Sequence, residues 1–170
     1  MLKQFGVTHV LVGHSERRAI GETDEQINKK LKAVLAAGMT PILLIGEQEK
    51  SVARSDYLID QLTHDLEDVS ADDAKKIIFC YEPVWAISSN AGGQAATPED
   101  ALSAIAEMKN ILSKLYPIHS TPYTFLYGGS VNEKNLADFL KHSEISGAVV
   151  GGASLKAEEF NRMIEIAATL

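Results

Sequence analysis

The sequence has 170 residues and a mass of 18.4 kDa, which is enough for one domain with a sizeable core, and its net charge of −7 argues against a general nucleic-acid-binding surface. No apolar run reaches the roughly 18 residues of a membrane span, and no secretory signal opens the chain. Because Cys80 is the only cysteine, no intrachain disulfide is possible, and we expect a cytoplasmic protein that binds neither nucleic acid nor membrane.

Five short and nearly continuous apolar runs predict β-strands. Such runs are typical of parallel strands that are buried on both faces, because strands with one solvated face alternate between apolar and polar residues. In chain order, the predicted strands are Val7–Val12, Pro41–Ile45, Ile77–Tyr81, Tyr123–Tyr127 and Ala148–Val150.

Amphipathic segments between these runs predict helices. Thr23 and Gln26 have the spacing of a capping box, and Thr97 is followed by a proline suited to the first turn of a helix. The predicted helices run from Thr23 to Gly38, Val52 to Leu66, Thr97 to Leu115, Glu133 to Lys141 and Ala157 to Ala168.

Strand–helix alternation of this kind predicts an α/β protein with parallel strands and right-handed crossovers. A doubly wound open sheet and a (βα)8 barrel both satisfy it. No G-x-G-x-x-G pattern follows the first strand, so the sequence does not support a dinucleotide-binding fold. Each predicted strand ends in a polar or glycine-rich cluster, and in a barrel these ends meet on the face that carries the active site.

Glu82 stands at the end of the third predicted strand, directly before Pro83-Val84-Trp85. A carboxylate held against a tryptophan and aliphatic neighbours is desolvated, which favours a proton-accepting role. A capping or ion-paired glutamate at a strand end is the alternative interpretation.

The last two strand ends predict an anion site. Gly129, Gly151 and Gly152 would let backbone N–H groups approach phosphate oxygens closely, and Ser130 adds a hydroxyl donor. His14 precedes a predicted helical turn near Ser15, where a helix N-terminus disfavours the imidazolium, so a neutral ring could donate to a carbonyl. A core histidine bonded to backbone is the alternative.

Metal binding has no support in the sequence. The other histidines show no metal-ligand spacing, so we expect no metal.

Four motifs resemble the triosephosphate isomerase family, in that family's order and with similar spacing across the whole chain. They are GHSERR at 13–18, YEPVWAI at 81–87, YGGSV at 127–131 and VGGASL at 150–155. The resemblance implies an intramolecular aldose–ketose isomerase of glycolysis and gluconeogenesis. Such an enzyme interconverts dihydroxyacetone phosphate and glyceraldehyde 3-phosphate through an enediolate, without a cofactor.

The resemblance also implies a role for each matching residue. Glu82 would move the carbon-bound proton, neutral His14 would polarise the carbonyl, and Glu16 would support the charge network of the site. The phosphate of the triose would bind at Ser88, Gly129, Ser130, Gly151 and Gly152, and the lid over it would begin with Pro83, Val84, Trp85, Ala86 and Ile87.

Three features of the sequence depart from the family pattern. The stretch 88–96 is longer than the family lid and lacks its lysine. Leu44 replaces a cysteine, a change expected to affect packing more than chemistry. Val149 replaces the leucine that, with Ile87, walls in the base, so the enclosure of Glu82 should be weaker.

The family's N-terminal third has no match in the sequence, and with it the catalytic lysine and asparagine. A (βα)8 barrel needs about 250 residues. The resemblance therefore implies an incomplete (βα)8 TIM barrel with five parallel strand–helix units, strands 4–8 of the family fold, as a single partial domain over residues 1–170.

Two hypotheses about function follow. The chain is either an isomerase or a non-catalytic, truncated phosphate-binding half-barrel or assembly module without turnover. Because an incomplete barrel leaves strand edges and apolar surface open, we expect a homo-oligomer in either case.

Overall fold

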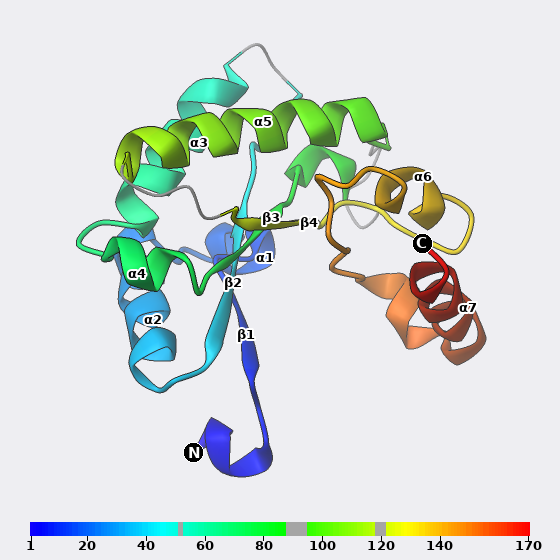
Figure 1. Cartoon of the computed structure of the whole chain (residues 1–170), viewed down its shortest axis with the longest axis horizontal. Coiled ribbons are helices and arrows are strands. Elements are labelled where there is room, and N and C mark those ends of the chain that lie inside the picture. The colour runs from blue at the N-terminus through cyan, green and yellow to red at the C-terminus, as the bar shows by residue number, and fades with distance from the viewer. Residues whose placement is uncertain (51–52, 88–94, 118–121) are drawn as a thin grey trace.

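The computed structural model describes residues 1–50, 53–87, 95–117 and 122–170. Within these ranges, four parallel strands form one sheet in the order β1-β2-β3-β4. The strands are β1 (His9–Val12), β2 (Thr40–Ile45), β3 (Ile78–Tyr81) and β4 (Thr124–Tyr127). The predicted α/β fold with parallel strands is confirmed, and it is consistent with part of a (βα)8 barrel (Figure 1).

The predicted helices are present, although several are shorter than expected. The described helices are α1 (Ser15–Ala19), α2 (Asp24–Ala36), α3 (Arg54–Asp65), α4 (Ala71–Ala74), α5 (Pro98–Leu115), α6 (Leu136–Leu140) and α7 (Ala157–Ala168), and the 3-10 turns are Leu2–Phe5, Val84–Ala86 and Gly152–Leu155. Thr23 and Gln26 form a reciprocal capping box at α2, and Thr97 and Asp100 form another at α5. These caps satisfy N–H groups that the first turn of a helix leaves unpaired.

The fifth predicted strand, Ala148–Val150, does not form, and this part of the expectation is wrong. The segment contributes an isolated parallel bridge between Tyr127 and Ala148. The backbone still bonds to β4 on both sides, from Tyr127 N to Gly147 O and from Val149 N to Tyr127 O. Glycines flank the three apolar residues, which leaves the run too short to extend this pairing into a regular strand.

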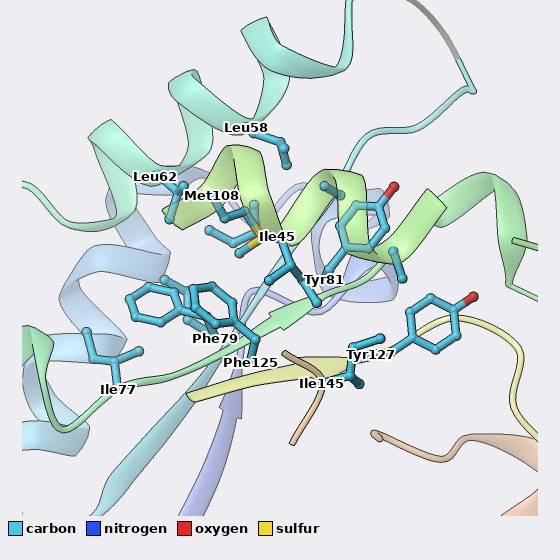
Figure 2. Packing of buried hydrophobic residues seen from close by; sticks show 14 of the residues in the cluster. Ile45, Leu58, Leu62, Ile77, Phe79, Tyr81, Met108, Phe125, Tyr127 and Ile145 are labelled. Carbon is cyan, nitrogen blue, oxygen red and sulfur yellow. The ribbon is translucent and has the colours of Figure 1, made fainter. Parts of the chain in front are cut away.

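The core lies between one face of the sheet and helices α2, α3 and α5. Helix α2 packs on β1 and β2, α3 on β2, and α5 on β3, and neighbouring helices contact each other. Figure 2 shows Leu58 and Leu62 of α3 and Met108 of α5 directed toward Phe79 and Phe125 of the sheet. This burial of large apolar side chains is the main stabilising contribution to the fold.

The other face of the sheet is less covered than the apolar runs predicted. Leu11 of β1 is 50% exposed, whereas Val12, on the face toward the helices, is 4% exposed. Burial on both faces, expected from the continuous apolar pattern, therefore fails at β1. Among the described helices, none has the length and apolar character needed to cross a membrane.

Candidate active site

Two predicted catalytic residues, from different strand ends, are in direct contact. His14 follows β1 and is the N-cap of α1, and Glu82 follows β3. His14 Nε2 lies 3.0 Å from Glu82 Oε1, and the Ser15 backbone N–H donates to Glu82 Oε2 at 2.9 Å. The parallel order of the sheet brings these residues together although 67 positions separate Ser15 from Glu82.

The hydrogen bonds of His14 define its tautomer. The Glu16 backbone N–H donates to His14 Nδ1 at 3.2 Å, so that ring nitrogen carries no proton. The ring proton is then on Nε2, which faces Glu82 and the cavity. A neutral imidazole with a fixed N–H is a hydrogen-bond donor directed at any group that enters beside Glu82.

The carboxyl group of Glu82 is almost fully buried, with 3% of the residue exposed. Burial raises the pKa of Glu82 above its ordinary value, because the charged form loses water. The facing His14 and the Ser15 N–H oppose this shift by stabilising the carboxylate. A buried carboxylate with a raised pKa is a stronger proton acceptor than a solvated one.

The close approach of β2 to β3 holds the Glu82 backbone. Glu82 N donates to Ile45 O at 2.8 Å, and Val84 N donates to Glu47 O at 3.0 Å, so the two bonds flank Gly46. A Cβ added to Gly46 would overlap the carbonyl carbon and oxygen of Glu82. Only glycine permits this approach, and the position of the carboxylate therefore depends on Gly46.

A cavity of about 400 Å³ opens beside the His14–Glu82 pair. Most of the predicted site residues line it: His14, Glu16, Glu82, Ile87, Gly129, Ser130, Gly151 and Gly152. Val149, predicted to enclose the base together with Ile87, also lines the wall. Ser88 lies outside the described residues. A cavity of this size accommodates a small metabolite.

Two glycine loops, Gly128–Gly129 and Gly151–Gly152, line the same cavity as the carboxylate. At Gly151 and Gly152 no atom of another described residue, apart from the adjoining residues in the chain, lies within 4 Å of the position that a Cβ would take. The Ser130 hydroxyl and backbone N–H both donate to Ala86 O, at 2.7 and 3.1 Å. Ser130 therefore connects the predicted anion site with the predicted lid.

Glu47 is a residue whose part in this site the sequence analysis missed. Its buried carboxylate accepts hydrogen bonds from Tyr81 Oη at 2.8 Å and from Trp85 Nε1 at 2.7 Å. Tyr81 precedes Glu82, and Trp85 lies in the 3-10 turn of the predicted lid. The available signal was the carboxylate that directly follows Ile45-Gly46, which is the same pattern that identified Glu82.

Lys50 adds a second contact to this turn. Its Nζ lies 4.8 Å from the centre of the Trp85 ring and 2.9 Å from Asp100 of α5. The described start of the predicted lid is thus held by Glu47 and Lys50 of the segment after β2, and Lys50 is itself bonded to α5.

Metal-ligating groups do not gather at the cavity. Across the described ranges, the residues that could jointly hold a metal ion are Asp24, Asp60 and His64, and none of them lines the cavity. The described lining offers the carboxylates of Glu82 and Glu16, the imidazole N–H of His14, the hydroxyl of Ser130 and backbone donors.

Fold and cavity together define a parallel α/β protein of the (βα)-barrel class, with its site at the carboxyl ends of the strands. The sequence profile of the triosephosphate isomerase family matches residues 1–167, and the chain belongs to this family.

Named relatives are similar over nearly the whole chain. The chain is 42% identical to the triosephosphate isomerase of Endomicrobium trichonymphae, over 97% of this chain and 66% of the relative. It is 44% identical to that of Fusobacterium nucleatum, with the same two coverages, and 40% identical to that of Dictyoglomus thermophilum, over 97% and 67%. The chain therefore spans about two thirds of the length of these relatives.

Proposed function

We propose that this protein is a triosephosphate isomerase, which interconverts dihydroxyacetone phosphate and glyceraldehyde 3-phosphate. The observation that carries the proposal is the 3.0 Å contact between His14 Nε2 and Glu82 Oε1 on the wall of a cavity that Gly151 and Gly152 also line. One cavity thus offers a proton acceptor, a neutral donor and a loop for an anion, as the reaction requires.

Glu82 is the proposed carbon base. Its carboxylate removes a proton from the carbon beside the carbonyl, and the bonding electrons form the enediolate. The same carboxyl group returns the proton to the neighbouring carbon, which completes the exchange of ketose and aldose. The buried position and raised pKa of Glu82 support this role.

His14 is the proposed electrophile. Its Nε2–H donates to the carbonyl oxygen, stabilises the charge that develops there, and shuttles the hydroxyl proton between the two enediolate oxygens. The bond from the Glu16 N–H supports this role, because it keeps the proton of a neutral ring on Nε2. Glu16, whose side chain lines the cavity, supports the charge network.

The phosphate group of the triose occupies the part of the cavity that the two glycine loops line. Gly129, Gly151 and Gly152 supply backbone N–H donors to the phosphate. The Ser130 hydroxyl, which donates to Ala86 O in this structure, turns to donate to the phosphate instead. Ser88 is the remaining proposed phosphate contact. Pro83 to Ile87 start the lid that excludes water over the bound triose. The lysine of the family's N-terminal third would add positive charge here, and this chain corresponds to the family's carboxyl-terminal strand–helix units.

A homo-oligomer in the cytoplasm is part of this proposal. The half-exposed Leu11 on an edge strand and Phe5, which is 80% exposed, support association. A single buried cysteine, Cys80, is compatible with a reducing compartment.

The decisive experiment separates proton transfer from binding. The protein is incubated with dihydroxyacetone phosphate in D2O, and deuterium incorporation beside the carbonyl is followed by NMR, together with a coupled assay in the direction of glyceraldehyde 3-phosphate. We expect both activities, and Glu82→Asp should lower kcat on the order of a hundredfold, because the shorter carboxylate lies about 1 Å from its productive position.

Glu82→Gln should abolish exchange while 2-phosphoglycolate still binds. Glu144→Gln changes an exposed carboxylate that does not line the cavity; it is the matched control and should leave both unchanged. Binding of 2-phosphoglycolate without exchange or turnover in the wild type would favour the non-catalytic phosphate-binding hypothesis. Equal turnover in wild type and Glu82→Gln would show that Glu82 is not the base.

A further inference from the structure

Asp65, the last residue of α3, is fully buried and lies outside the cavity. Its Oδ2 accepts a 2.7 Å bond from Arg18 Nη2, and its Oδ1 has no hydrogen-bond partner among the residues that the structure describes. A buried carboxylate costs free energy unless it is paired, so its burial on the packed face of α3, beside Leu58, Gln61 and Leu62, calls for an explanation.

Arg18 connects this carboxylate to the turn that carries His14. Its Nη2 binds Asp65, its Nη1 binds Asp24 at the start of α2, and its Nε donates to Gly13 O at 2.9 Å. The side chain is 13% exposed. Because a guanidinium is a rigid planar fork, fixing two of its nitrogens fixes the direction of the third. Asp65 and Asp24 together therefore aim Nε at Gly13.

The turn over 13–15 determines where both reacting side chains lie. Gly13 has φ +81°, and a Cβ there would lie 3.0 Å from Leu44 O and 3.2 Å from Arg18 Nη2. His14 Nε2 and Ser15 N are the two groups that contact the Glu82 carboxylate. A shift of this turn would move the electrophile and one hydrogen bond of the base at the same time.

We propose that Asp65 is a positioning residue of the isomerase site, which acts through Arg18 to hold the turn of Gly13, His14 and Ser15 in register with Glu82. The expected effect of Asp65 on catalysis rests on the proposed function. The contact path itself, from Asp65 to Arg18 to Gly13, does not depend on turnover.

We expect the strength of this hold to vary with pH near neutrality. Two carboxylates share one guanidinium, and burial raises the pKa of Asp65 to about 7. The charged groups that face this cluster are Arg18 from α1, Asp24 from α2, and Asp60 and His64 on α3, whose ligand atoms approach Asp24. Ionised Asp65 binds the guanidinium more strongly than protonated Asp65 does, so the turn should respond to this titration.

The first test uses NMR and does not need activity. The Arg18 Nε–H and the Gly13 carbonyl carbon are followed from pH 5.5 to 8.5 in the wild type. We expect a component with an apparent pKa near 7 that disappears in Asp65→Asn, a nearly isosteric change, and persists in His64→Gln and in Glu82→Gln. If Asp65→Asn leaves the profile unchanged, or if the wild type shows no such component, the proposal is overturned.

The second test asks whether the effect on the site runs through Arg18. We expect Asp65→Asn to lower kcat about tenfold with KM changed less than twofold, Arg18→Lys to have a similar effect, and the double variant to be no worse than Arg18→Lys. Additive losses, or a loss in KM alone, would refute the path. If the wild type shows no turnover at all, the proposed function fails, while the NMR titration still decides the positioning role.

Discussion

Gly46→Ala should damage both stability and the site, because one methyl group would be placed against the backbone of Glu82. The added Cβ would overlap the Glu82 carbonyl and lie 3.1 Å from Pro83 N. Two hydrogen bonds, Glu82 N to Ile45 O and Val84 N to Glu47 O, hold the chains together on either side of this contact. The methyl group has no free space, so the β2 and β3 ends must separate.

The size of the effect follows from ordinary contact distances. Carbon atoms pack best at about 3.5–4.0 Å, so relief of the overlap requires a displacement of roughly 1 Å. Overpacking of this kind costs about 1–3 kcal/mol in the free energy of unfolding. For a domain of this size, that corresponds to a Tm decrease of about 2–12 °C. Moving the Glu82 carboxylate by about 1 Å should also lower kcat on the order of a hundredfold.

Gly152→Ala is the matched control, since within the described part of the chain nothing beyond the adjoining residues lies within 4 Å of a Cβ at Gly152. Thermal unfolding and 2-phosphoglycolate binding should be measured for both variants. We expect Gly46→Ala to lose stability, and Gly152→Ala to keep its Tm but bind the anion more weakly, because the methyl group enters the cavity. A Gly46→Ala protein with wild-type Tm and turnover would refute the argument that this contact positions Glu82.

Three further predictions concern other parts of the fold. The stability of Asp65→Asn relative to the wild type should rise as pH rises from about 4 to about 7. The pKa of Asp65 is raised to about 7 in the folded protein, so the wild type is favoured most below the unfolded pKa, where Asp65 is protonated. This contribution, on the order of 4 kcal/mol in total, is lost as pH rises through the folded pKa. Urea unfolding at pH 5 and pH 8 checks this, and a pH-independent difference would contradict it. Thr97→Ala should cost about 1 kcal/mol in urea unfolding, because the Asp100 N–H loses its 3.2 Å cap bond, whereas the exposed Ser113→Ala in the same helix should change stability by less than about 0.5 kcal/mol. Trp85→Phe should lower the free energy of unfolding by about 1–3 kcal/mol, since Glu47 loses its 2.7 Å indole donor. Amide exchange in the turn Val84–Ala86 should become faster. Unchanged exchange would show that this bond does not hold the turn.

The strand–helix order of the fold could be predicted because each signal was local. Thr23 and Thr97 mark helix starts through short-range hydrogen bonds, and the apolar runs around Ile42 and Phe79 coincide with strands. The segment Ala148–Val150 misled because strand formation depends on how much pairing the neighbouring backbone offers, and a three-residue apolar run does not contain that information.

The residues that line the cavity could be predicted in part, again from local signals. Position at a strand end, combined with parallel topology, brought His14, Glu82 and the glycine loops to one cavity, although their roles stay predictions. Asp65 could not be found in this way, because its significance depends on a contact with Arg18 across 47 positions inside a helix. Glu47 was visible as a strand-end carboxylate, but its acceptance of bonds from Tyr81 and Trp85 is a property of the packed structure.

The cavity draws its walls from the ends of β1, β3 and β4 and from the segment after the Ala148 bridge, so no single hairpin or helix contains it. A molecule that fills the cavity would contact residues that follow both edge strands, β1 and β4. These residues come together only when the strands between them are paired, so binding would require the paired sheet. Its binding energy is therefore added to the free energy of unfolding of the whole sheet. At a concentration one hundred times its Kd, such a ligand adds about 2.7 kcal/mol. The concentration of such a ligand would then set the equilibrium between the folded and the unfolded chain.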